Sequence, residues 1–450
     1  MSNPDGVNEL YAAHVSELTA HYAEVLHAAH VDAVVIGAGT PHPVFLDDQH
    51  LPFKPNPYLL HWGPLTEHPG SALVVRLDAD PEWLIHTPVD YWHKVPQPPD
   101  LLAEGPVRIT VVNSADDIAN RVQQLPKRRA FIGEAVKPED RFGIANTNPA
   151  ALIAAINELR TRKSPWEVDN MRRATARGVR GHLAAERCFL AGGSEYDIHL
   201  AFRSACRTTD AEMPYPAIVA LNAHAATLHY QRLERTVSAH HSLLIDAGAA
   251  WQGYASDITR THSEDAEFGA LIEAMHELQR ALCEAALPGV DYRELHHAAH
   301  LGIAGLLRDA ELISVAPETA AEAGIVRFFF PHGLGHFLGL QVHDVGALYT
   351  RGSATDTAAS NGADKHLRLT RTLQPGNVLT VEPGLYFIPS LLDELQSSPH
   401  TGCINWPRID GLRPFGGIRI EDNIHITDQG NENLTRAAFA AAAESEADSG

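Results

Sequence analysis

The opening segment of the chain, Asn8 to His30, carries apolar residues at the spacing of one helix face, which predicts an amphipathic helix. Short apolar runs follow it, and a second helix is predicted before the last of them, over Asp116–Gln124. The runs that predict strands are Ala33–Gly37, Ala72–Leu77, Glu82–Ile85, Val107–Val112 and Ala130–Gly133. Strands that alternate with helices are typical of an α/β domain, which we place at residues 1–160.

The sequence Ser164-Pro165-Trp166-Glu167 marks the next boundary. Serine as the N-cap, proline at the first helical position and the following glutamate form a capping box, which predicts a long helix to Leu190. Amphipathic helices are expected at Ala266–Ala286 and Tyr292–Arg308. Strand-like runs with polar residues at their ends lie at Ile218–Leu221, Leu243–Asp246, Val378–Pro383 and Ile418–Ile424. These elements predict a second, α+β domain over residues 161–440.

Four segments lack such periodicity. The proline-rich connection Pro41–Pro57 is too irregular for a helix or strand and is expected to be a functional loop. Thr350–Lys365 is expected to be a mobile surface loop, because it is rich in Ser, Thr, Asn and Asp. Leu391–Ile404 is expected to be a solvated excursion rather than part of a pocket mouth. Residues 441–450 are expected to form a flexible tail, since the segment from Ala437 onward should fray.

Composition narrows the class of protein. A chain of 450 residues exceeds what one hydrophobic core usually serves, so two domains are expected. The formal net charge of −21 argues against nucleic acid or an anionic membrane as a partner. The N-terminus lacks a signal peptide pattern, and no apolar stretch is long enough to span a bilayer. The cysteines are widely spaced, which fits a reducing compartment, so we expect a cytoplasmic protein.

Two carboxylates mark the stretch Ser242–Thr261. An apolar run ends on Asp246, glycines permit a turn, and Asp257 lies in a second β-favouring run. This pattern predicts a hairpin-like turn with one carboxylate on each arm. Two facing carboxylates would repel each other, and a bound cation would offset that repulsion. Two solvated turn aspartates are the alternative, and the spacing taken alone favours that alternative.

Histidines cluster between Phe328 and Asp344. His332 and His336 are four residues apart, but the intervening glycines argue against a helix and therefore against the helical zinc motif. His343 is a third candidate in the same region. Taken alone, the pattern leaves a ligand role and a structural role for these histidines equally open.

Two glutamates interrupt later apolar strands. Glu382 ends the run that begins at Val378, and Glu421 lies in a run where Arg419 shares its strand face. A solvated turn for Glu382 and an exposed ion pair between Arg419 and Glu421 are the alternatives. Considered together, however, four carboxylates and one histidine form an oxygen-rich ligand set. Such a set suits two divalent cations of the manganese type better than a closed structural zinc site, and it predicts metal-assisted hydrolysis.

The ordered motifs I-D-A-G…S-D-I-T-R-T, P-H-G-L-G-H, V-E-P-G-L-Y and G-I-R-I-E-D resemble those of the pita-bread metallopeptidases. That group includes prolidases (Xaa-Pro dipeptidases), aminopeptidase P, methionine aminopeptidases and creatinase. The resemblance implies an α/β N-terminal creatinase-like domain and an α+β pita-bread catalytic domain. The V-H-D sequence at His343, with LDDQHLPFKPNPYLLHW and PYPAIVALNAHAATLHY, is most similar to bacterial prolidases, a subgroup that includes organophosphorus acid anhydrolases.

The resemblance also implies a role for each matching residue. Two divalent ions, expected to be Mn²⁺ with Co²⁺ or Zn²⁺ as alternatives, would be held by Asp246, Asp257, His336, Glu382 and Glu421. Asp257 and Glu421 would bridge the ions, Asp246 would hold one ion, and His336 with Glu382 would complete the other. Glu382 would also exchange protons with a bridging hydroxide. His332 and His343 would line the substrate pocket, Arg419 would pair with the substrate carboxylate, and Tyr215 and His229 match pocket positions. Thr259 would support the ligands.

The leading hypothesis is therefore a dinuclear Xaa-Pro dipeptidase. An Xaa-Pro bond lacks an N–H group and has a fixed local backbone, so a small closed pocket with a carboxylate anchor can select it. A wall would set the dipeptide length, and Asp47–Trp62 or Tyr91-Trp92 could supply it. Relatives often take this wall from a neighbouring subunit, so we expect a homodimer.

Three alternatives are weighed against that hypothesis. An aminopeptidase resembling aminopeptidase P would act on longer peptides. Hydrolysis of organophosphate triesters is expected only as a side activity of the same centre. A metal-free relative that acts as a binding module is disfavoured, because all five ligand residues are present.

Overall fold

The computed structural model describes residues 4–92, 94, 97–135, 138–237, 239–348 and 366–447. The predicted surface loop Thr350–Lys365 lies outside the described residues. Two compact units make up the chain, one formed mainly by residues 1–170 and the other mainly by residues 171–450. Within the described ranges, no helix is long and apolar enough to cross a membrane.

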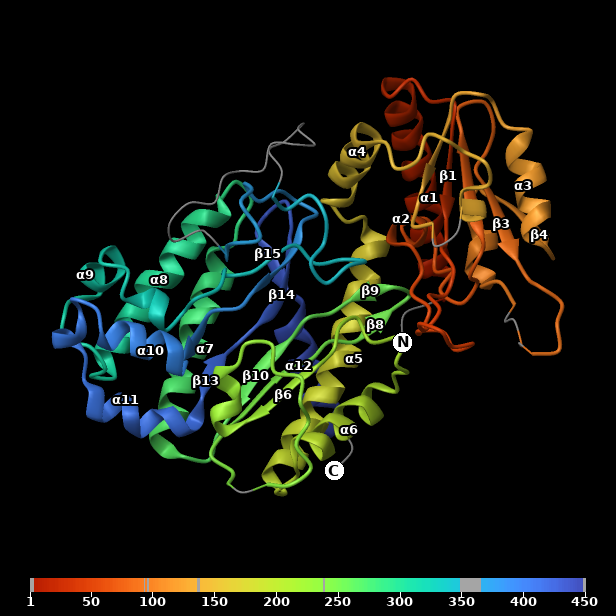
Figure 1. Cartoon of the computed structure of the whole chain (residues 1–450). Helices are drawn as coiled ribbons and strands as arrows, with labels where there is room; N and C mark the ends of the chain where they lie inside the picture. Colours follow the sequence, from red (N-terminus) through yellow and green to blue (C-terminus); the bar gives the residue numbers. More distant parts are fainter. Residues whose placement is uncertain are drawn as a thin grey trace. The chain divides into compact units, whose positions relative to one another are not determined.

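The N-terminal unit is a five-stranded mixed sheet in the order β4-β3-β2-β1-β5 (Figure 1). Strand β2 runs antiparallel to both β1 and β3, whereas β1 with β5 and β3 with β4 are parallel pairs. Four strands therefore end at the same edge of the sheet. The elements are α1 (Pro4–Ala28), β1 (Ala33–Gly37), α2 (Pro57–Leu60), β2 (Ala72–Arg76), β3 (Glu82–His86), β4 (Arg108–Val112), α3 (Ala115–Gln123), β5 (Arg129–Ile132) and α4 (Ala150–Arg160).

Buried residues alternate across the two faces of this sheet. On one face, Val35 and Val74 pack with Ile118 and Val122 of α3. Helix α1 contacts strand β2 and turns Tyr11 and its apolar stripe inward. Every strand predicted in this region is present, and the helices cover the apolar sheet as expected of an α/β unit.

Helix α5 (Pro165–Leu190) begins with the predicted capping box, in which the Glu167 carboxylate accepts the backbone N–H of Ser164 at 2.8 Å. The elements after it are α6 (Glu195–Cys206), β6 (Ile218–Leu221), β7 (Leu243–Asp246), β8 (Ala250–Trp251), β9 (Tyr254–Ala255), β10 (Thr259–His262), α7 (Ala266–Ala285), α8 (Tyr292–Asp309), α9 (Pro317–Glu322), β11 (Val378–Val381), β12 (Gly384–Tyr386), α10 (Pro389–Gln396), α11 (Trp406–Leu412), β13 (Gly417–Arg419), β14 (Asp422–Ile426), β15 (Asn431–Asn433) and α12 (Leu434–Ala447).

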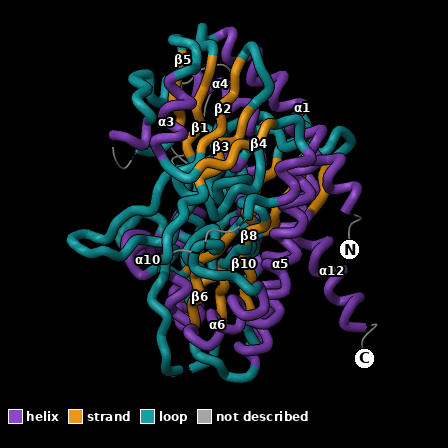
Figure 2. The backbone as a smooth tube through the Cα atoms, turned by 90° about the vertical axis from the view of Figure 1, so that its right-hand side faces the viewer, coloured by secondary structure: helices purple, strands orange, loops and turns teal. Residues whose placement is uncertain are grey.

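The strands of the C-terminal unit form small antiparallel sheets in the orders β10-β7-β6, β11-β14-β15 and β12-β13. A single bridge between Thr259 and Glu421 joins the first of these to the chain between β13 and β14. Helices α5 and α6 lie on one side of the strands, and α7 and α8 lie on the other (Figure 1). Figure 2 shows α5 and α6 beside the strands β6 and β10. This arrangement brings the ends of several short strands together in the interior of the unit.

Two expectations are wrong in this unit. The run Ile418–Ile424 is not one strand, because it breaks at Ile420 and Glu421 so that β13 pairs with β12 and β14 pairs with β11. The segment Leu391–Ile404 is not a solvated excursion, since Leu392 and Leu395 of α10 are fully buried in the core. The segment from Ala437 is helical as far as the structure describes it, since α12 continues to Ala447, and the last three residues of the predicted tail lie outside the described residues.

Candidate metal centre and substrate cavity

The predicted hairpin holds the two aspartates beside each other. Strand β7 pairs with β10 so that Asp246 faces Thr259, and Asp257 lies just before β10. The two arms approach so closely that position 248 requires glycine, because a Cβ atom there would lie 2.0 Å from the Ser256 carbonyl oxygen. The Tyr215 hydroxyl lies 2.9 Å from Asp246 Oδ1 and 2.5 Å from Asp257 Oδ1, which places Tyr215 at the predicted site.

The histidine loop runs extended beside β11 and is not helical, as predicted. The carbonyl of His336 accepts the N–H of Thr380 at 2.9 Å, and the carbonyl of Leu334 accepts that of Glu382 at 2.8 Å. Gly335 permits this contact, since a Cβ atom there would lie 2.2 Å from the Thr380 carbonyl oxygen. The backbone pairing therefore places the side chains of His336 and Glu382 together.

The buried ring of His336 is oriented for an acceptor role. Its Nδ1 lies 3.0 Å from the Phe337 carbonyl oxygen, so the neutral ring carries its proton on Nδ1. In the metal-free protein burial acts to lower the pKa of His336, but the hydrogen bond with Asp257 and the charge of Glu382 raise it overall, so that Nε2 can also carry a proton. Its Nε2 faces the carboxylates, at 3.5 Å from Asp257 Oδ2 and 3.7 Å from Glu382 Oε1. A backbone carbonyl behind the ring and carboxylates in front of it is the arrangement that metal-binding histidines adopt.

Glu421 completes the cluster from the break between β13 and β14. Its backbone N–H donates to the Thr259 carbonyl at 3.1 Å, and the Thr259 hydroxyl donates to Glu421 Oε2 at 2.7 Å. Ligand atoms of Asp257, His336 and Glu421 all lie within 4.8 Å of one another. The contact of Thr259 matches the supporting role that the resemblance implies.

Burial and neighbouring charges shift the pKa values of the acidic groups in this cluster. Burial raises the pKa of Glu382 to about 7, and it raises the pKa of Glu421 well above its usual range, with Asp257 adding to the effect. Burial likewise raises the pKa of Asp246. Burial is the largest influence on Asp257 and acts to raise its pKa, but the hydrogen bond and charge of His336, the Tyr215 hydroxyl and the charge of His343 together outweigh it, so the pKa is lowered. Carboxylates that repel one another in a buried site are stabilised by divalent cations, so the cluster fits such ions.

The Glu382 shift predicts a pH dependence for the stability of the metal-free protein. The folded state binds this proton more tightly than the unfolded chain, whose pKa is the ordinary 4.5. The charged carboxylate therefore opposes folding, with its full cost above pH 7 and none below pH 4.5. Metal-free Glu382→Gln is expected to exceed the wild type in unfolding free energy by about 1–3 kcal/mol at pH 8, and the difference should vanish towards pH 4.5.

Urea unfolding at several pH values, with a chelator present, measures this difference. Glu264→Gln removes an exposed carboxylate and is the matched control. A difference between Glu382→Gln and the wild type that stays constant across the pH range would contradict the raised pKa.

Arg419 is buried, and its guanidinium is already engaged by neighbouring side chains. It donates to Asp246 Oδ2 at 2.7 Å, to the Tyr386 hydroxyl at 2.9 Å and to the Thr259 hydroxyl at 3.2 Å. His332 joins the same chain, since its Nε2 lies 2.8 Å from the Tyr386 hydroxyl and its Nδ1 lies 2.8 Å from the Gly333 carbonyl oxygen. Burial and the charge of Arg419 lower the pKa of His332 to about 3. His332 is therefore neutral, with its proton on Nδ1.

A cavity of about 880 Å³ opens over the cluster. It brings together all of the predicted site residues except Tyr215, which contacts two of them from the side. The lining residues are Leu228, His229, Asp246, Asp257, Pro331, His332, Gly333, Gly335, His336, His343, Leu348, His366, Leu367, Arg368, Glu382, Arg419 and Glu421. Burial, followed by the charges of His336 and Arg368, lowers the pKa of His343 to about 4.

The sequence reasoning missed Arg368, which is exposed and lines this cavity. It also missed the support behind Glu421. Asp422 is fully buried and accepts hydrogen bonds from Arg260 at 2.7 Å and from Asn433 at 2.8 Å, and it pairs with Arg436 at 2.8 Å. Arg260 also donates to the carbonyls of Thr259 and Glu421. The only signal in the sequence was an acidic residue next to Glu421, which by itself indicates no partner.

Comparisons with known proteins agree with this geometry. Residues 169–428 match the model of metallopeptidase family M24, and residues 9–157 match the N-terminal domain of Xaa-Pro dipeptidases. A Xaa-Pro dipeptidase of Shewanella loihica is 44% identical over 429 residues, which cover 95% of this chain and 97% of the relative. One of Stenotrophomonas maltophilia is 43% identical over 439 residues, which cover 96% and 98%.

Solved structures share the fold. A substrate complex of Escherichia coli aminopeptidase P matches with a TM-score of 0.70 and 22% identity, over 96% of this chain and 99% of that one. The Pseudomonas aeruginosa aminopeptidase PepP matches with a TM-score of 0.69 and 22% identity, over 97% and 99%. The predicted fold class, an α/β N-terminal domain followed by a pita-bread catalytic domain, is therefore confirmed.

Proposed function

Because the chain belongs to the Xaa-Pro dipeptidases of metallopeptidase family M24, we propose that it hydrolyses the bond before a C-terminal proline in dipeptides. The observation that carries this proposal is the cavity, in which an acidic cluster with one oriented histidine lies beside two arginines. Such a cavity offers a site for activating water and cations for a substrate carboxylate. The relatives similar over nearly the whole chain are named for the same activity.

For the metal ions, we propose the ligand set Asp246, Asp257, His336, Glu382 and Glu421. Asp257 and Glu421 would hold both ions, Asp246 would hold one of them, and His336 with Glu382 would hold the other. The oxygen-rich set favours Mn²⁺, with Co²⁺ or Zn²⁺ as alternatives. When bound, two such ions supply a water of lowered pKa as the nucleophile.

We assign proton transfer and substrate positioning to side chains that line the cavity. Glu382 lines the cavity, with its Oε1 3.7 Å from His336 Nε2, and is suited to accept a proton from the attacking water and return it to the leaving proline nitrogen. His343 and His229 line the cavity and are assigned to the substrate backbone. The neutral ring of His332, whose Nε2 lies 2.8 Å from the Tyr386 hydroxyl, is assigned to a fixed wall of the pocket.

We assign recognition of the substrate carboxylate to Arg368 rather than to Arg419. Arg419 donates to three protein groups, including Asp246, and is thereby suited to orient a metal ligand. Arg368 is exposed at the cavity, where its guanidinium can reach a ligand without breaking a buried ion pair. This assignment differs from the one that the family resemblance implies for Arg419.

The activity is tested by hydrolysis of Ala-Pro, Leu-Pro and Ala-Pro-Pro by chelated protein, with and without added Mn²⁺. We expect manganese-dependent cleavage of the dipeptides, and a kcat/KM for Ala-Pro-Pro lower by about 100-fold, because a longer substrate loses the carboxylate contact. Preference for the tripeptide would place the chain with the aminopeptidases, and no cleavage of any substrate would refute the function. Diethyl 4-nitrophenyl phosphate in the same assay tests the predicted organophosphate side activity.

We also propose a homodimer, supported by apolar side chains at the surface of the N-terminal unit. Phe45, Leu46 and Val89 are 88, 90 and 88% exposed, and Tyr91 and Trp92 are 86 and 75% exposed. Large apolar groups in such number on neighbouring loops indicate a protein contact. Sedimentation velocity is expected to find a dimer for the wild type and a monomer for the double variant Phe45→Asp, Trp92→Asp. A wild-type monomer at micromolar concentration would contradict the proposal.

A further inference from the structure

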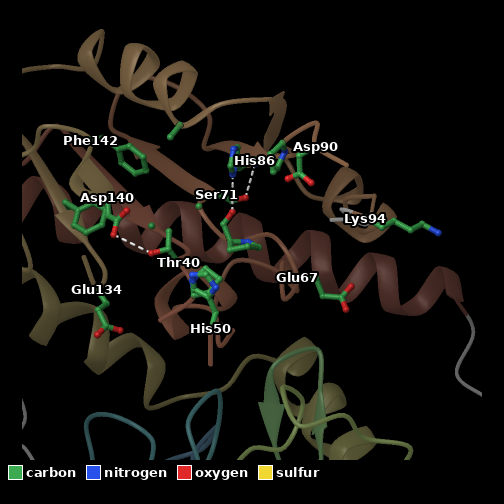
Figure 3. A pocket seen from close by; sticks show the side chains of 18 residues that line it. Thr40, His50, Glu67, Ser71, His86, Asp90, Lys94, Glu134, Asp140 and Phe142 are labelled. Atoms are coloured by element: carbon green, nitrogen blue, oxygen red, sulfur yellow. Dashed lines mark hydrogen bonds between the residues drawn. The ribbon is translucent and has the colours of Figure 1, made fainter. Parts of the chain in front are cut away.

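The N-terminal unit has a cavity of its own, with a volume of about 560 Å³ (Figure 3). It lies at the edge of the sheet where β1, β3, β4 and β5 end and where β2 begins. Its lining includes Gly37 at the end of β1, Ser71 before β2, His86 at the end of β3, Ala115 after β4 and Phe131 in β5. Open α/β sheets bind ligands at the carboxyl ends of their strands, and this volume suits a small molecule.

The inner wall of this cavity is apolar and aromatic. Phe131 and Phe142 are buried, and their rings meet edge to face with centroids 6.2 Å apart. Phe142 has a φ of 50°, a left-handed conformation that costs free energy for a bulky residue and is retained most often at functional sites. Gly39 also lines the cavity, and a Cβ atom there would meet nothing within 4 Å, so its backbone faces open space.

Polar groups converge from two sides of this wall. Figure 3 shows Thr40, His50 and Asp140 on one side and Ser71, His86 and Asp90 on the other. The Ser71 hydroxyl accepts the backbone N–H of His86 at 2.9 Å and can donate its own proton to a ligand. The Thr40 hydroxyl lies 3.4 Å from Asp140 Oδ2, which fixes a carboxylate near the entrance.

The charge of the lining selects the kind of ligand. Glu67, Asp90, Glu134 and Asp140 contribute four carboxylates, of which Glu134 lies 3.1 Å from His42 Nε2. Among the described lining residues one lysine, Lys94, carries the opposite charge. In Figure 3 the Lys94 side chain extends away from the other groups. A hollow with a negative rim concentrates cations, and its aromatic wall favours a flat apolar body.

From these observations we propose that the cavity of the N-terminal unit binds a small organic cation, an amine or guanidinium carried on a flat apolar group. The site is distinct in its residues from the acidic cluster of the C-terminal unit. It also shares no residue with the apolar side chains assigned to the subunit contact, since Phe45, Leu46, Tyr91 and Trp92 are not among its lining.

Tyramine is the probe, and its binding to the full-length, metal-loaded protein is measured by calorimetry and by saturation-transfer NMR. The matched ligands are 4-ethylphenol, which lacks the amine, and 3-(4-hydroxyphenyl)propanoate, which carries the opposite charge. Two variants locate the site. Ala115→Trp fills the cavity from an exposed helix start, and Asp140→Asn removes the charge beside Thr40. Glu24→Gln, on the exposed surface of α1, is the control.

We expect tyramine to bind at least about tenfold more tightly than either matched ligand, and each of the two variants to weaken it by about tenfold or more. Glu24→Gln should bind as the wild type, and Ala-Pro cleavage by Ala115→Trp should be unchanged, which shows that the variant folds. Failure of tyramine to bind, equal or tighter binding of the anion, or binding that Ala115→Trp leaves intact would overturn the proposal. Absence of dipeptide cleavage by the wild type would refute the proposed enzymatic function, but it would not affect the evidence from tyramine binding.

Discussion

Replacing Asp257 by asparagine is expected to abolish Ala-Pro cleavage, with a loss in kcat/KM on the order of 10³-fold or more, while the protein stays folded. Asp257 lies at the centre of the acidic cluster, within reach of the Nε2 atom of His336 and close to Glu421. An amide offers one neutral oxygen in place of a charged bridge, so divalent ions lose both charge compensation and a shared ligand. Steady-state kinetics at saturating Mn²⁺ measure the loss, and calorimetry measures the affinity for Mn²⁺.

A control variant and folding measurements distinguish a loss of catalysis from a loss of folding. Glu264→Gln removes an exposed carboxylate from the loop just after β10 and should keep full activity and metal affinity. Far-ultraviolet circular dichroism and urea unfolding of the metal-free Asp257→Asn protein should resemble the wild type, because losing one of several mutually repelling carboxylates offsets the lost contact with His336. An Asp257→Asn protein that is folded and retains more than about a tenth of the activity would disprove the bridging role.

The sequence predicted the elements whose signal is local. All five strands of the N-terminal sheet follow from apolar runs, and the start of α5 follows from its capping box. The break at Ile420 and Glu421 could not be predicted, because it is imposed by two different partner strands, β12 and β11. Helix α10 was missed for a related reason, since Leu392 and Leu395 are buried by a core assembled from distant segments.

The candidate site likewise has a part that local motifs predict and a part that they do not. The motifs placed Asp246, Asp257, His336, Glu382 and Glu421 in one cavity, because each is fixed by a short strand or a glycine turn nearby in the sequence. Contacts between residues far apart in the sequence could not be predicted. The chain that links Asp246, Arg419, Tyr386 and His332 joins residues far apart in the sequence, and it alters what the Arg419 guanidinium is free to do. Arg368 carries no motif, so only the cavity reveals it.

Arg368→Ala is expected to raise KM for Ala-Pro by about 10- to 100-fold with little change in kcat, because a charge-assisted contact to the substrate carboxylate is worth about 1.5–3 kcal/mol. The loss should be absent for Ala-Pro amide, which has no carboxylate. Arg419→Lys is expected to behave differently, since Arg419 holds Asp246 and Tyr386 in the buried cluster. It should lower kcat and the affinity for Mn²⁺ with both substrates.

The comparison of the two arginines across the two substrates decides which one binds the carboxylate. Arg327→Ala removes an exposed arginine that pairs with Glu394 and should leave both substrates unaffected. Arg368→Lys should recover part of the loss, because the charge remains while the paired N–H donors are removed. If instead Arg419→Lys raises KM for Ala-Pro alone and Arg368→Ala has no effect, then Arg419 binds the carboxylate, as the family resemblance implied. In that case its hydrogen bond to Asp246 must yield to the substrate, so that binding the dipeptide would reorient a metal ligand.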